Sequence, residues 1–127
     1  MADDDYCYLT TTGRRSGQPH RIEIWYAEAD HAEGSRTLYL LAGAGMASDW
    51  VRNLMAAPDV TVEIGTETRR AHGRVLDQGG DEAARARSSV FAKYDPREAR
   101  DLSSWRDTAL PVAIDLGASV SADPARG

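Results

Sequence analysis

The sequence predicts a mainly β, α+β fold: a barrel of about six strands, with a short helix after the third strand and two helices before the last. Most apolar runs are short, rich in β-branched and aromatic residues, and bounded by turn residues. Helical patterns are few. The chain has 127 residues, 42% of them hydrophobic and 28% charged, which suits one globular domain. Many strands and few helices in so small a domain favour a barrel over a layered parallel sheet.

The first part of the chain predicts a hairpin. Residues 1–5 are polar and predict a flexible N-terminus. Residues 6–13 (YCYLTTTG) are expected to form the first strand, and residues 20–29 (HRIEIWYAEA) alternate apolar and polar side chains as a half-buried strand does. The turn between them contains glycine and proline and is short enough to pair the two strands.

A buried strand and a short helix are expected next. Residues 36–44 (RTLYLLAGA) are nearly continuously apolar, which indicates a buried strand. Ser48 or Asp49 can then cap a helix, because either side-chain oxygen accepts a hydrogen bond from an unpaired backbone N–H. We expect this helix to have about two turns and to end at Pro58.

The second half predicts another hairpin, two helices and a closing strand. Residues 59–65 alternate strictly and pair with residues 66–77 through a turn at Gly65–Thr66. Gly73 indicates a bulge or a close approach of another segment. The remaining expectations are helices over residues 81–95 and 96–108, a strand over residues 110–117, a flexible tail over residues 118–127, and a single domain over residues 6–117.

The composition argues against several classes of protein. The formal net charge is -5, so no nucleic-acid partner is expected. Cys7 is the only cysteine and lies in an apolar run, which predicts a packed thiol in a reducing cytoplasm. The histidines lack metal-ligand spacing, so no metal is expected. No signal peptide or membrane-length apolar run is visible, so no stable membrane insertion is expected.

Two local features favour a small anionic ligand. Arg14, Arg15 and Arg21 cluster around the first turn of an otherwise acidic chain, and guanidinium groups suit phosphate and carboxylate oxygens. The segment GAG at residues 43–45 joins an expected strand to an expected helix, where backbone N–H groups attract phosphate. This segment lacks the third glycine of a dinucleotide fingerprint, and an ordinary β-to-α turn explains it equally well.

Two motifs, in order, resemble a known family. Residues 9–21 (LTTTGRRSGQPHR) resemble the strand-and-turn motif of the deazaflavin-dependent nitroreductases, also called quinone reductases. Residues 39–65 (YLLAGAGMASDWVRNLMAAPDVTVEIG) resemble their second motif, in which a strand and a small-residue loop precede a helix with Trp, Asn and Leu. The resemblance covers about residues 8–76 and, more loosely, the closing LPVAIDL strand.

The resemblance implies a split β-barrel that binds coenzyme F420, a deazaflavin with a phosphodiester and an oligoglutamate tail. It implies hydride transfer from the reduced coenzyme to a quinone, a nitroaromatic or another conjugated acceptor. The cofactor carries the chemistry, and the sequence accordingly shows no catalytic triad or dyad. Because relatives of this barrel often pair, the resemblance also suggests a homodimer.

The resemblance assigns residues to the site as well. The cofactor-binding positions fall in the first turn, the following strand, the small-residue loop and the next helix: Arg14, Arg15, Ser16, Gly17, Arg21, Glu23, Ile24, Ala42, Gly43, Ala44, Gly45, Trp50, Arg52 and Asn53. Tyr26 and Tyr94 are candidates for the substrate pocket, where a hydroxyl can donate a proton to the reduced acceptor. Core packing is an equal interpretation for Trp50 and the preferred one for Trp105.

Departures from the family pattern leave two alternatives open. Glu23 and Ile24 stand where many relatives carry Asn-Pro, and a glutamate there either repels an anionic ring or shapes the substrate pocket. The GAGMASD loop has no lysine and Asp49 adds negative charge, although Arg52 can substitute. The alternatives are an FMN-binding split-barrel oxidoreductase, whose phosphate the same turn would hold, and a non-catalytic module that binds a cofactor or lipid.

Overall fold

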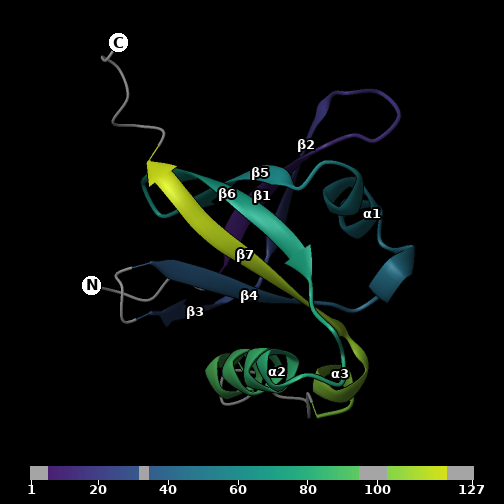
Figure 1. The fold of residues 1–127 in the computed structure, drawn as a ribbon, viewed down its shortest axis with the longest axis vertical. Coiled ribbons are helices and arrows are strands. Elements are labelled where there is room, and N and C mark those ends of the chain that lie inside the picture. The colour runs from purple at the N-terminus through teal and green to yellow at the C-terminus, as the bar shows by residue number, and fades with distance from the viewer. Residues whose placement is uncertain (1–5, 32–34, 95–102, 120–127) are drawn as a thin grey trace.

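The computed structural model describes residues 6–31, 35–94 and 103–119 (Figure 1). Seven strands form one antiparallel sheet in the order β2-β1-β5-β6-β7-β4-β3, which curls into a half-barrel and confirms the mainly β prediction. The strands are β1 (Cys7–Thr12), β2 (Pro19–Ile24), β3 (Ala27–Asp30), β4 (Arg36–Ala42), β5 (Asp59–Ile64), β6 (Glu67–Val75) and β7 (Leu110–Ser119). The helices are the 3-10 helix η1 (Gly45–Ala47), α1 (Asp49–Ala56), α2 (Asp81–Tyr94) and α3 (Ser103–Thr108).

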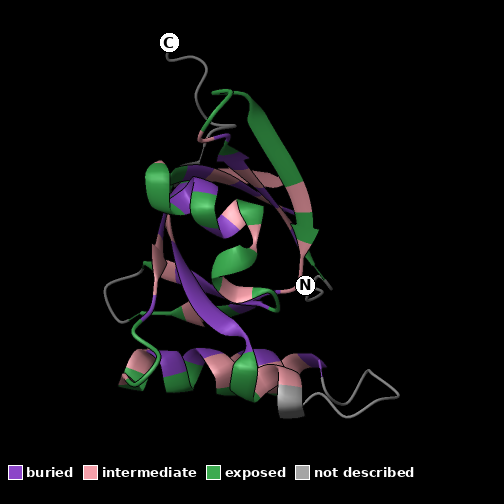
Figure 2. Cartoon of the chain, turned by 90° about the vertical axis from the view of Figure 1, so that its right-hand side faces the viewer, coloured by how far each residue is buried: buried purple, intermediate pink, exposed green. Residues whose placement is uncertain are grey.

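Strand β4 is buried on both faces and separates two apolar clusters. Leu38 and Leu40 belong to the cluster inside the curled sheet, which we call the inner cluster, whereas Tyr39 and Leu41 belong to a second cluster between α2 and the sheet. Successive side chains of a strand point to opposite faces, so both faces of β4 must be apolar. The nearly continuous apolar run therefore predicted this buried strand correctly. Figure 2 shows α2 at the bottom with its buried side toward the sheet.

Helix α1 packs against the inner cluster through Leu54, which is 1% exposed. The helix begins after Ser48 and ends two residues before Pro58, close to both predicted boundaries. Ser48 is the N-cap residue, but its side chain makes no capping hydrogen bond. The apolar positions and the proline thus located the helix, whereas the predicted cap contact does not form.

The thiol of Cys7 lies in the same inner cluster and is 1% exposed. Burial raises the pKa of this thiol to about 12, because the thiolate form would lose its solvation. The predicted packed cysteine is confirmed.

One predicted strand is divided in two. The segment expected as a single strand over residues 20–29 forms β2 at one edge of the sheet and β3 at the opposite edge. The chain changes direction at Tyr26, whose backbone N–H donates to the Tyr94 hydroxyl (3.1 Å), while that hydroxyl donates to the Tyr26 carbonyl (3.0 Å). The tyrosine of α2 thus takes over the backbone pairing that a strand neighbour would supply. The sheet therefore has seven strands where about six were expected.

The second hairpin and its glycine follow the prediction. Strands β5 and β6 pair across a turn at residues 65–66. Gly73 lies directly under α1: a Cβ at this position would be 2.3 Å from Leu54 Cδ1. The close approach predicted for Gly73 is confirmed, because only a residue without a side chain fits beneath the helix. The irregularity in the pairing of β6 with β7 lies between Arg69 and Ala71 instead.

The chain ends differ in small ways from the expectation. Helix α3 covers residues 103–108, and the remainder of the helix expected over residues 96–108 lies outside the described residues. Strand β7 continues to Ser119, two residues beyond the expected end of the domain at residue 117. The expected flexible tail began at residue 118, so its first two residues belong to β7, and residues 120–127 and the expected flexible segment over residues 1–5 lie outside the described residues.

Candidate functional site

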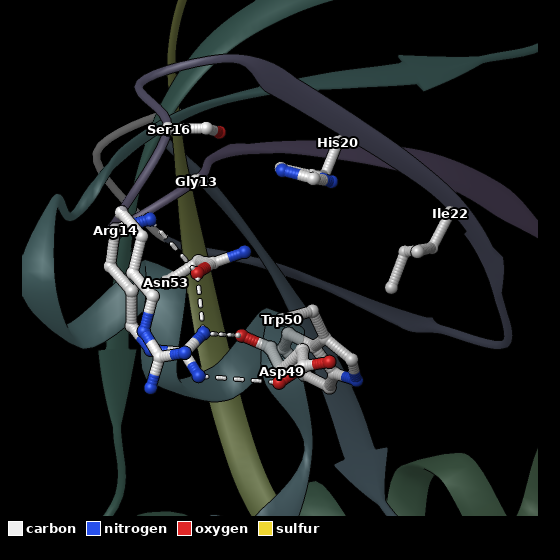
Figure 3. Close-up of a pocket in the computed structure, with 9 residues that line it drawn as sticks. Gly13, Arg14, Ser16, His20, Ile22, Asp49, Trp50 and Asn53 are labelled. Carbon is white, nitrogen blue, oxygen red and sulfur yellow. Dashed lines mark hydrogen bonds and ion pairs between the residues drawn. The ribbon is translucent and has the colours of Figure 1, made fainter.

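A cavity of about 330 Å³ lies between the β1–β2 turn, strand β2 and the first turn of α1 (Figure 3). We call the segment from Gly13 to Gln18 the arginine turn. Residues from three separate elements line the cavity: Gly13, Arg14, Arg15, Ser16, His20, Ile22, Asp49, Trp50 and Asn53. The structure therefore brings together five residues of the predicted cofactor-binding set, from the turn and from α1, and adds four that the resemblance did not assign.

The arginine turn is closed by its own backbone. The Gly13 N–H donates to the Gln18 carbonyl (2.8 Å), and the Gly17 N–H donates to the Gly13 carbonyl (2.9 Å). Gly17 has a φ of 73°, a conformation that side-chain-bearing residues rarely adopt. The Ser16 hydroxyl accepts a hydrogen bond from the Gln18 N–H (3.1 Å). These contacts hold Arg14, Arg15 and Ser16 at the tip of a short, defined turn.

Asn53 ties the arginine turn to α1. Its side chain is 5% exposed, and its Oδ1 accepts from the Arg14 backbone N–H (3.1 Å) and from Arg14 Nη1 (2.8 Å). Its Nδ2 donates to the Thr11 hydroxyl (3.4 Å). The amide is thus used within the protein, and Asn53 acts on the cavity by positioning Arg14.

The two arginines at the cavity differ in their pairing. Arg14 Nη2 lies 3.3 Å from Asp49 Oδ1, and Arg14 Nη1 donates to the Asp49 carbonyl (3.4 Å) (Figure 3). Arg15 is exposed, and within the described part of the chain its guanidinium makes no hydrogen bond or ion pair. Arg15 is therefore the cation most readily available to an anionic ligand.

Apolar side chains form another part of the cavity wall. Ile22 and Trp50 are half-buried and pack against the inner cluster. Figure 3 shows both beside the cavity, with His20 between Ile22 and the arginine turn. A basic end beside an aliphatic and an aromatic wall suits a ligand that combines a phosphate with a planar ring. Trp50 packs on the core, as one interpretation expected, and it also lines the cavity, where its contact with a cofactor stays a prediction.

The other predicted residues of β2 lie elsewhere. Because strand side chains alternate, Arg21 and Glu23 lie on the face of β2 opposite Ile22. Arg21 forms two hydrogen bonds with Glu63 (2.9 and 3.1 Å), which lower the pKa of that carboxyl, and it lies over the Tyr8 ring at 3.8 Å. The Tyr8 hydroxyl donates to Glu23 (3.4 Å). Neither predicted residue lines the cavity, nor does Ile24, which packs against the inner cluster.

The small-residue loop also lies outside the cavity lining. Ala42 is buried with Val51, whereas Gly43 and Ala44 are exposed and Gly45 begins η1. Arg52 is exposed, and its Nε donates to the Met46 carbonyl (2.9 Å), which connects α1 to η1. Contact of this loop and of Arg52 with a cofactor remains a prediction.

Tyr26 and Tyr94 are core residues in this structure. Each is 2% exposed, and the Tyr94 hydroxyl is bonded to the backbone of Tyr26. Trp25 stacks on Tyr94 with ring centroids 4.3 Å apart, and Trp105 meets Trp25 edge to face at 5.6 Å. We therefore correct the assignment of the two tyrosines to a substrate pocket. They join α2 to the sheet, because tyrosine satisfies the backbone of Tyr26 where a strand neighbour is missing.

An ionic network between α2 and the sheet was not predicted from the sequence. Arg74 makes two hydrogen bonds with Glu82 (both 2.8 Å) and two with Asp115 (2.7 and 3.1 Å). These bonds raise the pKa of Arg74 and lower those of both carboxyls. The Tyr39 hydroxyl also donates to Glu82 (2.9 Å). The network lies away from the cavity, and its only sequence signal is a charged residue within each of two strands and one helix.

Across the described segments, no three His, Cys, Asp or Glu side chains are grouped so as to hold a metal ion. No helix in those segments combines the length and apolar character needed to span a membrane.

The curled antiparallel sheet defines a split-barrel protein, and its cavity, basic at one end and partly aromatic, is a candidate ligand site. A sequence model of the F420H(2)-dependent quinone reductase family matches residues 1–117. The chain belongs to this family. It is therefore an oxidoreductase that depends on reduced coenzyme F420, as the two sequence motifs predicted, and the family match favours F420 over the FMN alternative.

Solved structures share the fold. An F420-H2 dependent reductase is 22% identical with a TM-score of 0.65, over 91% of this chain and 96% of its own. A protein described as a domain-swapped dimer is 22% identical with a TM-score of 0.64, over 90% and 81%. A FAD-binding protein from Mesorhizobium loti is 17% identical with a TM-score of 0.62, over 91% and 83%. Similarity at this level shows the fold, and a fold alone does not select the cofactor.

Proposed function

We propose that this chain transfers hydride from reduced coenzyme F420 to a quinone, a nitroaromatic or another conjugated acceptor, with the coenzyme phosphodiester at the arginine turn. The supporting observation is the cavity itself, in which Arg15 makes no ion pair with the described residues and lies near the apolar wall of Ile22 and Trp50. Guanidinium groups form strong, charge-assisted hydrogen bonds to phosphate oxygens. The residues present therefore fit a ring cofactor with a phosphate.

When bound, the deazaflavin ring supplies the hydride, so the protein needs no nucleophile or metal of its own for that step. Arg15 would pair with the phosphodiester, while Arg14, which is already paired with Asp49, and Ser16 line the same end of the cavity. Ile22 and Trp50 exclude water from one side of the cavity. Asn53 keeps the turn and α1 at a constant separation, which preserves the spacing between the cationic end and the apolar wall.

Replacing Arg15 with alanine tests the proposed phosphate site. We expect the dissociation constant for oxidised coenzyme F420, measured by fluorescence titration, to rise about ten- to a hundredfold, because a charge-assisted hydrogen bond contributes about 1.5–3 kcal/mol. Arg70→Ala is the matched control, since Arg70 is also exposed but lies on β6 outside the cavity. Equal affinities of wild type and Arg15→Ala would contradict this assignment.

Turnover tests the reaction itself. Oxidation of reduced coenzyme F420 by a soluble quinone and by a nitroaromatic, followed by absorbance, should proceed with wild-type protein and reveal the preferred acceptor. Parallel titration with FMN should give weaker binding than F420. Tight F420 binding with no turnover on any acceptor would instead support a non-catalytic cofactor carrier.

We further propose a homodimer in the cytoplasm. Strand β2 is an edge of the sheet, no other strand of the described residues pairs with its outer side, and one solved structure of the same fold is described as a domain-swapped dimer. The single buried cysteine suits a reducing compartment. Light scattering should give twice the monomer mass, and cell fractionation should recover the protein with the cytoplasm. A monomer mass or a membrane-bound fraction would contradict the respective proposal.

A further inference from the structure

The charged groups at the cavity nearly cancel. The charged side chains that line it are Arg14, Arg15 and Asp49, which leave one surplus positive charge when histidine is counted as neutral. Asp49 is 83% exposed at the mouth of the cavity and is paired with Arg14 at 3.3 Å. An incoming anion therefore meets one arginine whose charge is already balanced and one that is not.

The small-residue loop next to the cavity adds no cation of its own. Residues 43–49 contain no lysine or arginine. Arg52 is committed to the Met46 carbonyl, and Arg21 to Glu63 on the other face of β2. Lys93, the only lysine of the chain, donates to the Tyr26 carbonyl within the α2 contact. At the cavity, a ligand with several anionic groups would thus meet one unpaired cation, Arg15, and one carboxylate that repels it, Asp49.

We propose that Asp49 limits the ligand charge that this site accepts, so that the cavity binds a ring cofactor through its single phosphodiester and gains nothing from a long oligoglutamate tail. This inference rests on the proposed binding of coenzyme F420 at the arginine turn. Each tail carboxylate that approaches Asp49 is repelled, and the repulsion offsets the general attraction of anions to Arg15. The chain is accordingly specific for the phosphate-bearing head of the coenzyme and tolerant of tail length.

The test compares dissociation constants for forms of coenzyme F420 with short and long oligoglutamate tails. With wild-type protein at low salt, we expect the two affinities to agree within about threefold. In Asp49→Asn, the preference for the long tail should increase about three- to tenfold, the effect of one nearby charge in water-like surroundings. The increase should disappear in concentrated salt, which screens charges beyond a few ångströms.

The ratio of the two affinities is the informative quantity, because removing Asp49 also releases Arg14 and strengthens binding of every anionic ligand. Asp59→Asn is the matched control: Asp59 is exposed and follows the other end of α1, outside the cavity. Its long-to-short ratio should equal that of wild type. Thermal unfolding confirms that each variant is folded.

The outcomes separate the two proposals. A wild-type affinity that rises steeply with tail length, or an Asp49→Asn ratio equal to that of wild type, would overturn the role of Asp49 while F420 binding at the site stands. Binding of neither form of the coenzyme would overturn the proposed function and this inference together.

Discussion

Replacing Asn53 with alanine should weaken both the fold and the ligand site. The substitution removes the acceptor for the Arg14 backbone N–H (3.1 Å) and for Arg14 Nη1 (2.8 Å), and it removes the longer contact with Thr11 (3.4 Å). The bond to the guanidinium contributes about 1.5–3 kcal/mol and the neutral bond about 0.5–1.5 kcal/mol. Because Asn53 is 5% exposed, water cannot fully replace it. We therefore expect a loss of about 2–4 kcal/mol in the free energy of unfolding.

Urea unfolding of wild type and Asn53→Ala measures this loss directly, and the melting temperature should fall by about 10 °C for a domain of this size. Asn53→Asp is the matched comparison, because a carboxylate retains both bonds from Arg14 and loses only the donor to Thr11. This variant should keep most of the stability. A loss below about 1 kcal/mol in Asn53→Ala would refute the reasoning, since it would mean that the turn is held without the amide. Weaker binding of coenzyme F420 by the folded Asn53→Ala protein is also expected.

Two further predictions concern packing and charge. Gly73→Ala places a Cβ 2.3 Å from Leu54 Cδ1, so we expect the free energy of unfolding, measured with urea, to fall by about 1–3 kcal/mol. In a Leu54→Ala background the same substitution should cost much less, because the clashing side chain is gone. Full stability of Gly73→Ala alone would contradict the close approach. Arg74 lowers the pKa values of Glu82 and Asp115, so its contribution to stability is present above the ordinary carboxyl pKa of about 4 and is lost as the pH falls through the lowered folded-state values. The stability difference between wild type and Arg74→Gln should therefore shrink in urea unfolding at progressively acidic pH, and a difference independent of pH would argue against the network.

Local patterns were sufficient to predict most elements of the fold. Alternation located β5 and β6, the apolar run located β4, and the spacing before Pro58 located α1, because each signal depends on a few neighbouring residues. The division of the segment around Tyr26 could not be predicted in this way, since it depends on the hydroxyl of Tyr94 in a distant helix. One continuous strand and two strands separated by a bend have the same alternating pattern of apolar and polar residues.

The sequence by itself determined the family, the cofactor and the arginine turn, because these follow from contiguous motifs. Recognising such motifs requires no knowledge of the tertiary contacts between elements. The tertiary structure alone decided which motif residues share a cavity. It joined Arg14 to Asp49 and Asn53 across more than thirty positions of the chain and turned Glu23 to the other face of β2. It also moved Tyr94 from the expected substrate pocket into the core. These outcomes depend on which strand edges and helix faces meet. That arrangement is set by the burial of apolar surface over the whole chain, and no single local segment determines it.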